Sequence, residues 1–229
     1  MTSLSNRIKD QARLLGFELA GIAPAGEADG FAHLEDWLAQ GFAGEMEYMP
    51  RLAEARRHPD SILPTVRSVV MVGINYKPAA SSRQPAPNTG SISCYAGGAD
   101  YHGVLREKLK LLLAWIQREV PGTRGRVVVD TAPLLERDFA RRAGLGWFGK
   151  NTMLLHKQLG SYFFLGALLL DLDLTAATSC HNHPLPRNAD ANVPKSASQS
   201  YVDLVTPSVD TTSTGTRICW RARSNEADP

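Results

Sequence analysis

The chain has 229 residues, 43% of them hydrophobic, which suits one large or two small globular domains with a buried core. Its 25 Lys and Arg residues against 23 Asp and Glu residues leave a net charge of +2, so no global field indicates a nucleic-acid or membrane partner. The N-terminus mixes both charge signs, unlike a signal peptide, and no run reaches the ~18 apolar residues of a membrane span. A cytoplasmic protein is therefore expected.

Two amphipathic helices are predicted first. Residues 3–16 and 31–42 carry apolar side chains at helical spacing, and Gly41 is a plausible stop for the second helix. The run SVVMVGINY at 68–76 is β-branched and nearly all apolar, which is typical of a strand buried on both faces. A loop rich in Pro, Ala and Ser follows it.

The second half repeats the alternation of helix and strand. We expect a long amphipathic helix at 103–119, a strand at 126–130 that ends in a carboxylate, a helix at 133–143, and one long or two short strands at 160–174. The predicted fold class is therefore α/β, a mixed sheet flanked by helices.

The composition changes after Leu174. The segment beyond it is rich in Ser, Thr, Asn and Pro and has almost no periodicity, which is typical of disorder. We expect one domain over 1–175 and an irregular or disordered tail over 176–229.

The three cysteines, Cys94, Cys180 and Cys219, are odd in number and widely spaced, so they favour free thiols in a reducing compartment. His181 and His183 stand beside Cys180, but this cluster lacks a second ligand pair at a standard spacing. No metal site is predicted from these residues.

The segment GLGWFGKNT at 144–152 contains G-x-G-x-x-G and nearly completes a phosphate-binding loop. Both nucleotide motifs require a strand before the glycines and a helix after them, whereas here Gly144 ends a predicted helix. A helix cap and turn is the simpler interpretation, with Gly144, Gly146 and Gly149 at positive φ. Together with the residues before it, the segment also has the character of a wall for a large polar cofactor.

Several segments in order resemble the epoxyqueuosine reductases, cobalamin-dependent iron–sulfur enzymes of queuosine biosynthesis on tRNA. They are GEMEYMPR, RRHPDSILPTVRSVVMVGINY, SCYAGGADYHGVLREKL, VDTAPLLERDFARRAGLGWFGKNTMLL and GSYFFLGALLLDLDL. The resemblance covers roughly residues 1–174, the N-terminal half of that family. It implies a cobalamin-binding domain, tRNA carrying epoxyqueuosine at the wobble position as substrate, an electron donor as partner, and a monomer.

The resemblance also implies roles for particular residues. Asp130 matches the proposed proton donor, and an opening epoxide does need a general acid within hydrogen-bond reach; the alternative is an Asp that caps the next helix. Asp100, Tyr101 and His102 match a D-Y-H motif bordering the substrate cleft. The positions that resemble cobalamin-lining residues are Arg57, Cys94, Tyr95, Glu136, Arg137, Trp147, Gly149, Lys150 and Asn151.

The chain departs from the family after residue 174. The family continues into a module whose cysteine runs hold 4Fe-4S clusters, and those ligands are absent from this sequence. We hypothesise that residues from about Ala176 onward are out of frame. A chain without clusters is expected to bind cobalamin and to be impaired in turnover.

Three other interpretations remain open. The first is a stand-alone cobalamin-binding or carrier domain without reductase activity. The second is a reductive dehalogenase, against which the lack of an export signal counts. The third is a non-functional fragment with an exposed apolar interface.

Overall fold

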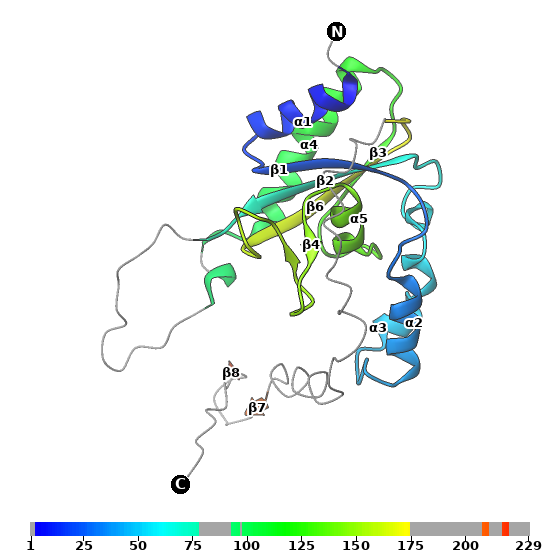
Figure 1. The fold of residues 1–229 in the computed structure, drawn as a ribbon, viewed down its shortest axis with the longest axis vertical. Helices are drawn as coiled ribbons and strands as arrows, with labels where there is room; N and C mark the ends of the chain where they lie inside the picture. The colour runs from blue at the N-terminus through cyan, green and yellow to red at the C-terminus, as the bar shows by residue number, and fades with distance from the viewer. Residues whose placement is uncertain (1–2, 78–92, 97, 175–207, 211–216, 220–229) are drawn as a thin grey trace, which may run out of the picture. The chain divides into compact units, whose positions relative to one another are not determined.

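The computed structural model describes residues 3–77, 93–96, 98–174, 208–210 and 217–219 (Figure 1). The chain divides into two compact units, Met1–His181 and Asn182–Pro229. Every element discussed below except one short strand pair belongs to the first unit. No helix among the described residues is both long and apolar enough to cross a membrane.

The first unit is built on a four-stranded sheet. Its strands are β1 (Leu19–Pro24), β2 (Ser68–Asn75), β3 (Gly125–Val128) and β6 (Phe163–Leu170), in the spatial order β1-β2-β6-β3. All three pairings are antiparallel. The α/β class is confirmed, whereas the sheet, expected to be mixed, is antiparallel throughout its described pairings.

Helices cover both faces of this sheet (Figure 1). The helices α1 (Leu4–Leu14) and α4 (Tyr101–Glu119) pack on one face, and α5 (Glu136–Arg142) packs on the other. The helix α2 (Phe31–Ala39) contributes Phe31 to the same side as α5. Because successive strand residues point to opposite faces, β2 sends Val70 and Val72 towards α4 and Val69 and Met71 towards α5.

Shorter elements complete the described structure. They are α3 (Tyr48–Arg51), the 3₁₀ turns Glu54–Arg56, Pro59–Ser61 and Cys94–Ala96, a hairpin of β4 (Trp147–Phe148) and β5 (Leu154–Leu155), and a pair formed by β7 (Ser208–Asp210) and β8 (Arg217–Cys219). The tail was expected to be disordered; apart from β7 and β8 it lies outside the described residues, as do Cys180, His181 and His183.

The predicted helices are confirmed, with shifts at their ends. The helix expected at 133–143 begins only at Glu136, because the residues after Asp130 form tight turns in which Leu134 N–H bonds to Ala132 C=O (2.8 Å). The segment 160–174 supplies one strand, β6, with Gly166 inside it. The strand β1 was not predicted.

The glycines of GLGWFGKNT have two different roles. Gly144 lies at φ 80° and ends α5, as expected. The expectation of positive φ at Gly146 and Gly149 is wrong, since the positive-φ glycines do not include them. A Cβ at Gly146 would lie 2.1 Å from the Leu155 carbonyl oxygen, and a Cβ at Gly149 would lie 2.6 Å from Leu155 Cδ1. These glycines permit close approach across the hairpin.

The helix α4 offers a direct test of this packing, because two adjacent leucines differ in burial. Leu112 is fully buried and Leu111 is 58% exposed. We expect Leu112→Ala to lower the free energy of unfolding by about 2–5 kcal/mol, and Leu111→Ala to change it by less than about 0.5 kcal/mol. Urea denaturation of both variants measures the difference. Equal losses would contradict this account of the core.

Candidate active site

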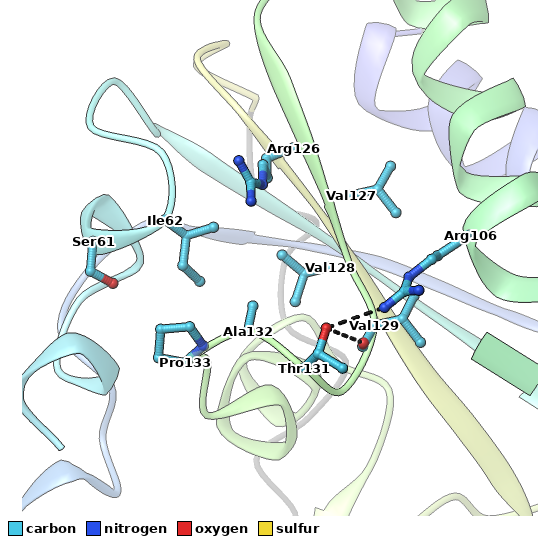
Figure 2. A pocket seen from close by; sticks show the side chains of 10 residues that line it. All are labelled: Ser61, Ile62, Arg106, Arg126, Val127, Val128, Val129, Thr131, Ala132 and Pro133. Carbon is cyan, nitrogen blue, oxygen red and sulfur yellow. Dashed lines mark hydrogen bonds between the residues drawn. The ribbon is translucent and has the colours of Figure 1, made fainter. Parts of the chain in front are cut away.

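A cavity of about 500 Å³ runs along β3 (Figure 2). Its walls come from β3, from the loop after it, from α4 through Arg106 and from the turn that contains Ser61 and Ile62. The Arg106 guanidinium donates a hydrogen bond to Thr131 Oγ1 (3.2 Å). Val129 and Thr131, the two neighbours of Asp130 in the chain, line this cavity, whereas Asp130 itself does not.

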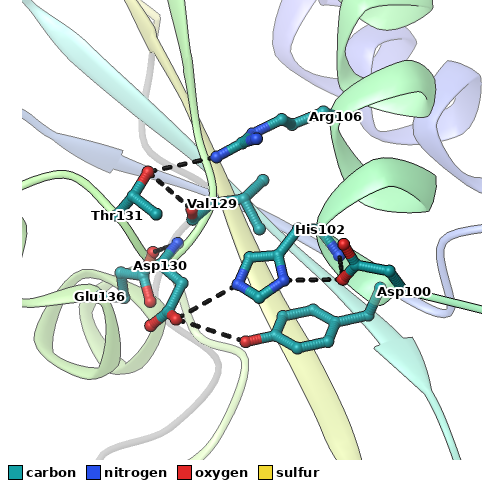
Figure 3. Close-up of polar contacts among 8 residues, drawn as sticks. Asp100, His102, Arg106, Val129, Asp130, Thr131 and Glu136 are labelled. Carbon is teal, nitrogen blue, oxygen red and sulfur yellow. Dashed lines mark hydrogen bonds and ion pairs between the residues drawn. The ribbon is translucent and has the colours of Figure 1, made fainter.

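Asp130 has an unusual backbone conformation. Its φ is 57°, in the left-handed region that residues other than glycine seldom adopt. The Asp130 N–H donates to Glu136 Oε1 at 3.0 Å, which ties the end of β3 to the first turn of α5 (Figure 3). The conformation costs free energy, and this hydrogen bond helps to hold it.

Two side chains from the start of α4 converge on the Asp130 carboxylate (Figure 3). His102 Nε2 lies 3.3 Å from Asp130 Oδ2, and the Tyr101 hydroxyl donates to the same oxygen at 3.4 Å. The other ring nitrogen of His102, Nδ1, lies 2.7 Å from Asp100 Oδ1. The result is a chain of polar groups, Asp100–His102–Asp130, that connects the start of the helix to the end of β3.

The local sequence explains why these side chains are held in place. Asp100 is the N-cap of α4 and accepts a hydrogen bond from His102 N–H (3.0 Å). Tyr101 stacks on Phe164 of β6 with centroids 4.0 Å apart and rings nearly parallel, and it also stacks on His102. The sheet therefore fixes the rings that contact Asp130.

The cluster shifts several pKa values. Burial raises the pKa of Glu136 to about 7, with a smaller contribution from the Asp130 charge. Burial, with the nearby Asp130 carboxylate, raises the pKa of Tyr101 to about 12. The hydrogen bond to Asp100, and after it the bond to Asp130, raises the pKa of His102, while the same His102 bond lowers the pKa of Asp100.

The Asp130 side chain itself is 60% exposed. The described residues around its carboxyl therefore leave it largely in contact with solvent. A ligand that covers the site would have to exclude that solvent. The carboxyl that the protein itself desolvates is that of Glu136.

The expected cofactor-lining residues fall into three groups. The first joins α5 to the hairpin, where Arg137 donates to the Thr152 carbonyl oxygen (2.8 Å) and Asn151 Oδ1 accepts from Met153 N–H. Trp147 is 41% exposed on β4, and Lys150 is exposed in the turn. Gly149 lies in the same hairpin, and Glu136, at the start of α5, joins this group to Asp130 by accepting the Asp130 N–H.

Cys94 and Tyr95 form the second group, on the exposed 3₁₀ turn before α4. Both lie near enough to Tyr76 to contribute to the raised pKa of its hydroxyl, although burial is the main cause. Tyr76 in turn packs on Phe164 with centroids 4.4 Å apart. A row of aromatic rings therefore links this turn to Tyr101.

Arg57 makes up the third group by itself, and its side chain contacts other residues than those of the Asp130 cluster. It pairs with Glu54, Glu27 and Glu35 and lies over the ring of Phe31, 4.3 Å from its centroid. No hydrogen bond or ion pair connects Arg57 to the described residues around Asp130. Its polar contacts are those of a surface ion-pair network.

The contacts of Tyr101 with Asp130 and Phe164, and of His102 with Asp100, were not predicted from the sequence. The motif D-Y-H was noticed, but a link across 28 residues to Asp130 cannot be inferred from local spacing. Within the described part of the chain, there is no group of three or more His, Cys, Asp or Glu side chains that could hold a metal ion.

Comparison with known proteins extends these observations. Residues 56–131 match the family model described as "Epoxyqueuosine reductase QueG, DUF1730". The chain is 47% identical over 180 residues to the epoxyqueuosine reductase of Gloeobacter violaceus, covering 77% of this chain and 54% of that protein. The Escherichia coli enzyme is 40% identical over 177 residues, which make up 76% of this chain and 47% of that enzyme. The chain thus spans about half the length of the curated relatives it matches.

Solved structures agree. The epoxyqueuosine reductase of Streptococcus thermophilus superposes with a TM-score of 0.71 at 27% identity, over 79% of this chain and 49% of that one. An epoxyqueuosine reductase bound to an epoxyqueuosine-modified tRNA-Tyr stem loop superposes with a TM-score of 0.68 at 28% identity, over 78% of this chain and 48% of that one. The Bacillus subtilis enzyme gives 0.65 at 26% identity over 78% and 48%, in a structure with an aspartate-bearing catalytic loop swung out of the active site. The resemblance to the epoxyqueuosine reductase family is thereby confirmed, for the N-terminal part of those proteins.

Proposed function

We propose that this chain is an epoxyqueuosine reductase-like protein that binds cobalamin and acts on epoxyqueuosine in tRNA, with Asp130 as the proton donor. The observation that carries the proposal is the exposed Asp130 carboxyl, held by Tyr101 and His102 at a strained strand end. The relative solved with a modified tRNA stem loop supports the substrate class. Cytoplasmic location and a monomeric state stay predictions from the sequence.

We infer that exposed side chains on the turn before α4, on the hairpin and just before β6 line a site for a large flat ligand with a polar rim. Tyr95, Trp147 and Tyr162 are large apolar side chains with 56%, 41% and 42% of their surface exposed. Arg137, Lys150 and Asn151 add charged and amide groups in the same region. Exposed aromatic faces beside polar groups are the features expected of a pocket for an organic cofactor. These residues would hold cobalamin, which when bound supplies a nucleophilic, reducible cobalt centre.

The chain's own contribution is to deliver a proton. We propose that Asp130 Oδ2 holds the proton that passes to the epoxide oxygen as that C–O bond breaks. Once Asp130 has given up its proton, His102 Nε2 lies 3.3 Å from Asp130 Oδ2, within reach to return one. The hydrogen bonds to Asp100 and to the Asp130 carboxylate raise the pKa of His102, so its ring holds a proton for this step. Asp100 is exposed at the start of the helix and completes the route to solvent. The electrons come from an external donor in this proposal.

Glu136 has a positioning role. Its carboxylate oxygen accepts the Asp130 N–H, so it holds the backbone conformation that presents the acid. Because its pKa is raised to about 7, its charge changes near neutral pH, which also changes the field at Asp130.

Cobalamin binding is the first test of the proposal. Trp147→Ala removes an exposed ring from the proposed lining, so we expect it to weaken cobalamin binding by about tenfold, measured by the absorbance change on titration. Leu111→Ala, on the far face of α4, is a matched control of an exposed large side chain and should leave binding unchanged. Equal affinity in both variants would remove Trp147 from the site.

Asp130→Asn tests the proton donor. With cobalamin, a chemical reductant and an epoxyqueuosine-containing stem loop, we expect turnover to fall by about 100-fold or more, because Asn cannot donate the proton. Asp173→Asn, at an exposed ion pair with Arg67, is the control. Undiminished turnover in Asp130→Asn would refute its role, and tight cobalamin binding without turnover by the unmodified chain would favour the carrier function.

Glu136→Gln tests the raised pKa through stability. A carboxyl whose pKa is higher in the folded than in the unfolded protein binds its proton more tightly when folded, so stability falls as pH rises from about 4.5 to about 7. The glutamine side chain cannot ionise, and we expect the variant to show a flatter dependence of the free energy of unfolding over this window. Parallel curves for the variant and the unmodified chain would place the pKa of Glu136 near its usual value.

A further inference from the structure

The strand β3 leaves backbone groups unpaired at one edge of the sheet. Among the described strands it pairs with β6 alone, since the strand order is β1-β2-β6-β3. The Asp171 N–H donates to the Arg124 carbonyl (3.1 Å), so the antiparallel alternation puts Arg126 and Val128 in hydrogen-bonded pairs with β6. The N–H and C=O groups of Gly125 and Val127 therefore point away from β6, and Val127 lines the cavity of Figure 2.

Two arginines flank this edge on opposite sides of the sheet (Figure 2). Arg126 projects from β3 to one side, and Arg106 reaches over the other side from α4. Neither makes an ion pair with a carboxylate among the described residues, and none of the ten residues that line the cavity is acidic. The charges therefore favour a ligand that brings a negative group to each side.

The rest of the lining favours a polypeptide over a nucleic acid. The walls are mostly small or branched apolar side chains, including Ile62, the valines of β3 and Pro133, and no lining residue is aromatic. Single-stranded nucleic acids are usually bound by stacking bases on aromatic rings. Outward N–H and C=O groups beside apolar walls are instead the features that accept an added strand.

A second copy of this chain is a poor occupant. Antiparallel pairing of two β3 edges would place Arg126 of one copy close to Arg126 of the other, and like charges across a strand pair are destabilising.

We propose that the β3 edge, Gly125–Val128 with Arg106 and Arg126, binds an extended acidic segment of a partner polypeptide as a fifth strand. Two acidic residues an odd number of positions apart would point to opposite faces and meet the two arginines.

Synthetic peptides test this surface in the full chain without cobalamin or tRNA, so the result is independent of the proposed function. The probe is the capped peptide TVEVTEVT, whose glutamates lie three positions apart, and the matched control is TVKVTKVT. We expect the acidic peptide to bind about tenfold more tightly, to shift the backbone amide resonances of Gly125 and Val127, and to slow hydrogen exchange at Val127. N-methylation of the peptide amides that face β3 should abolish binding.

A charge change at Arg126 tests the ion pairs separately from the backbone hydrogen bonds of the added strand. Arg126→Glu should remove the preference for the acidic peptide, because Arg106 remains and each peptide then meets one opposite and one like charge, whereas Arg118→Glu, an exposed arginine in the last turn of α4 outside the cavity, should leave the preference unchanged. The proposal is overturned if the unmodified chain binds both peptides equally, or if it shows no saturable binding of the acidic peptide at millimolar concentration. It is also overturned if an RNA stem loop, but not the peptide, shifts Gly125 and Val127 in a way that Arg126→Glu abolishes.

Discussion

The hydrogen bond from the Asp130 N–H to Glu136 Oε1 is the contact on which the candidate site depends. It joins the end of β3 to the start of α5 and supports a left-handed backbone at a residue other than glycine. With that conformation held, the Asp130 side chain turns towards Tyr101 and His102 instead of continuing the strand's alternation. A carboxyl on a strained strand end is a costly arrangement, and such strain is concentrated at functional sites.

The sheet and α4 provide the other half of the arrangement. The helix is anchored by buried leucines against β6, and its first turn is fixed by the Asp100 cap and by the stack of Tyr101 on Phe164. The imidazole of His102 is thereby placed between two carboxylates that come from different parts of the chain. In the proposed function, this placement would provide an acid, a group that resupplies its proton, and an exposed route to solvent.

The sequence predicted those parts of the fold that depend on local pattern. The helix α4 and the strand β2 followed from strong periodicity and from a β-branched run. The strand β1 was missed because LAGIAP has small residues and a proline, and its strand form depends on pairing with β2. The all-antiparallel sheet was missed because strand direction is set by the connections between elements, which periodicity does not reveal.

The candidate site likewise contains contacts that local sequence could indicate and contacts that depend on the fold. Asp130, Glu136 and Arg137 were proposed together because they share one short segment and a family motif, and the structure places Glu136 in contact with Asp130. The Asp130–His102 contact was not predicted, since it joins residues 28 positions apart. Arg57 was placed in the cofactor lining by its position in a motif, and its ion-pair partners in the structure are Glu54, Glu27 and Glu35; its role in cofactor binding stays a prediction. Three-dimensional proximity, not residue type, separates these cases.

The proposed proton supply requires His102 to carry a proton beside Asp130, and ¹⁵N NMR of the His102 ring can measure this. We expect both ring nitrogens to stay protonated above the pH at which an ordinary histidine titrates, and Asp130→Asn to lower the pKa of His102. A ring that titrates at its ordinary value, with no response to Asp130→Asn, would contradict the account and leave Asp130 without its proton supply.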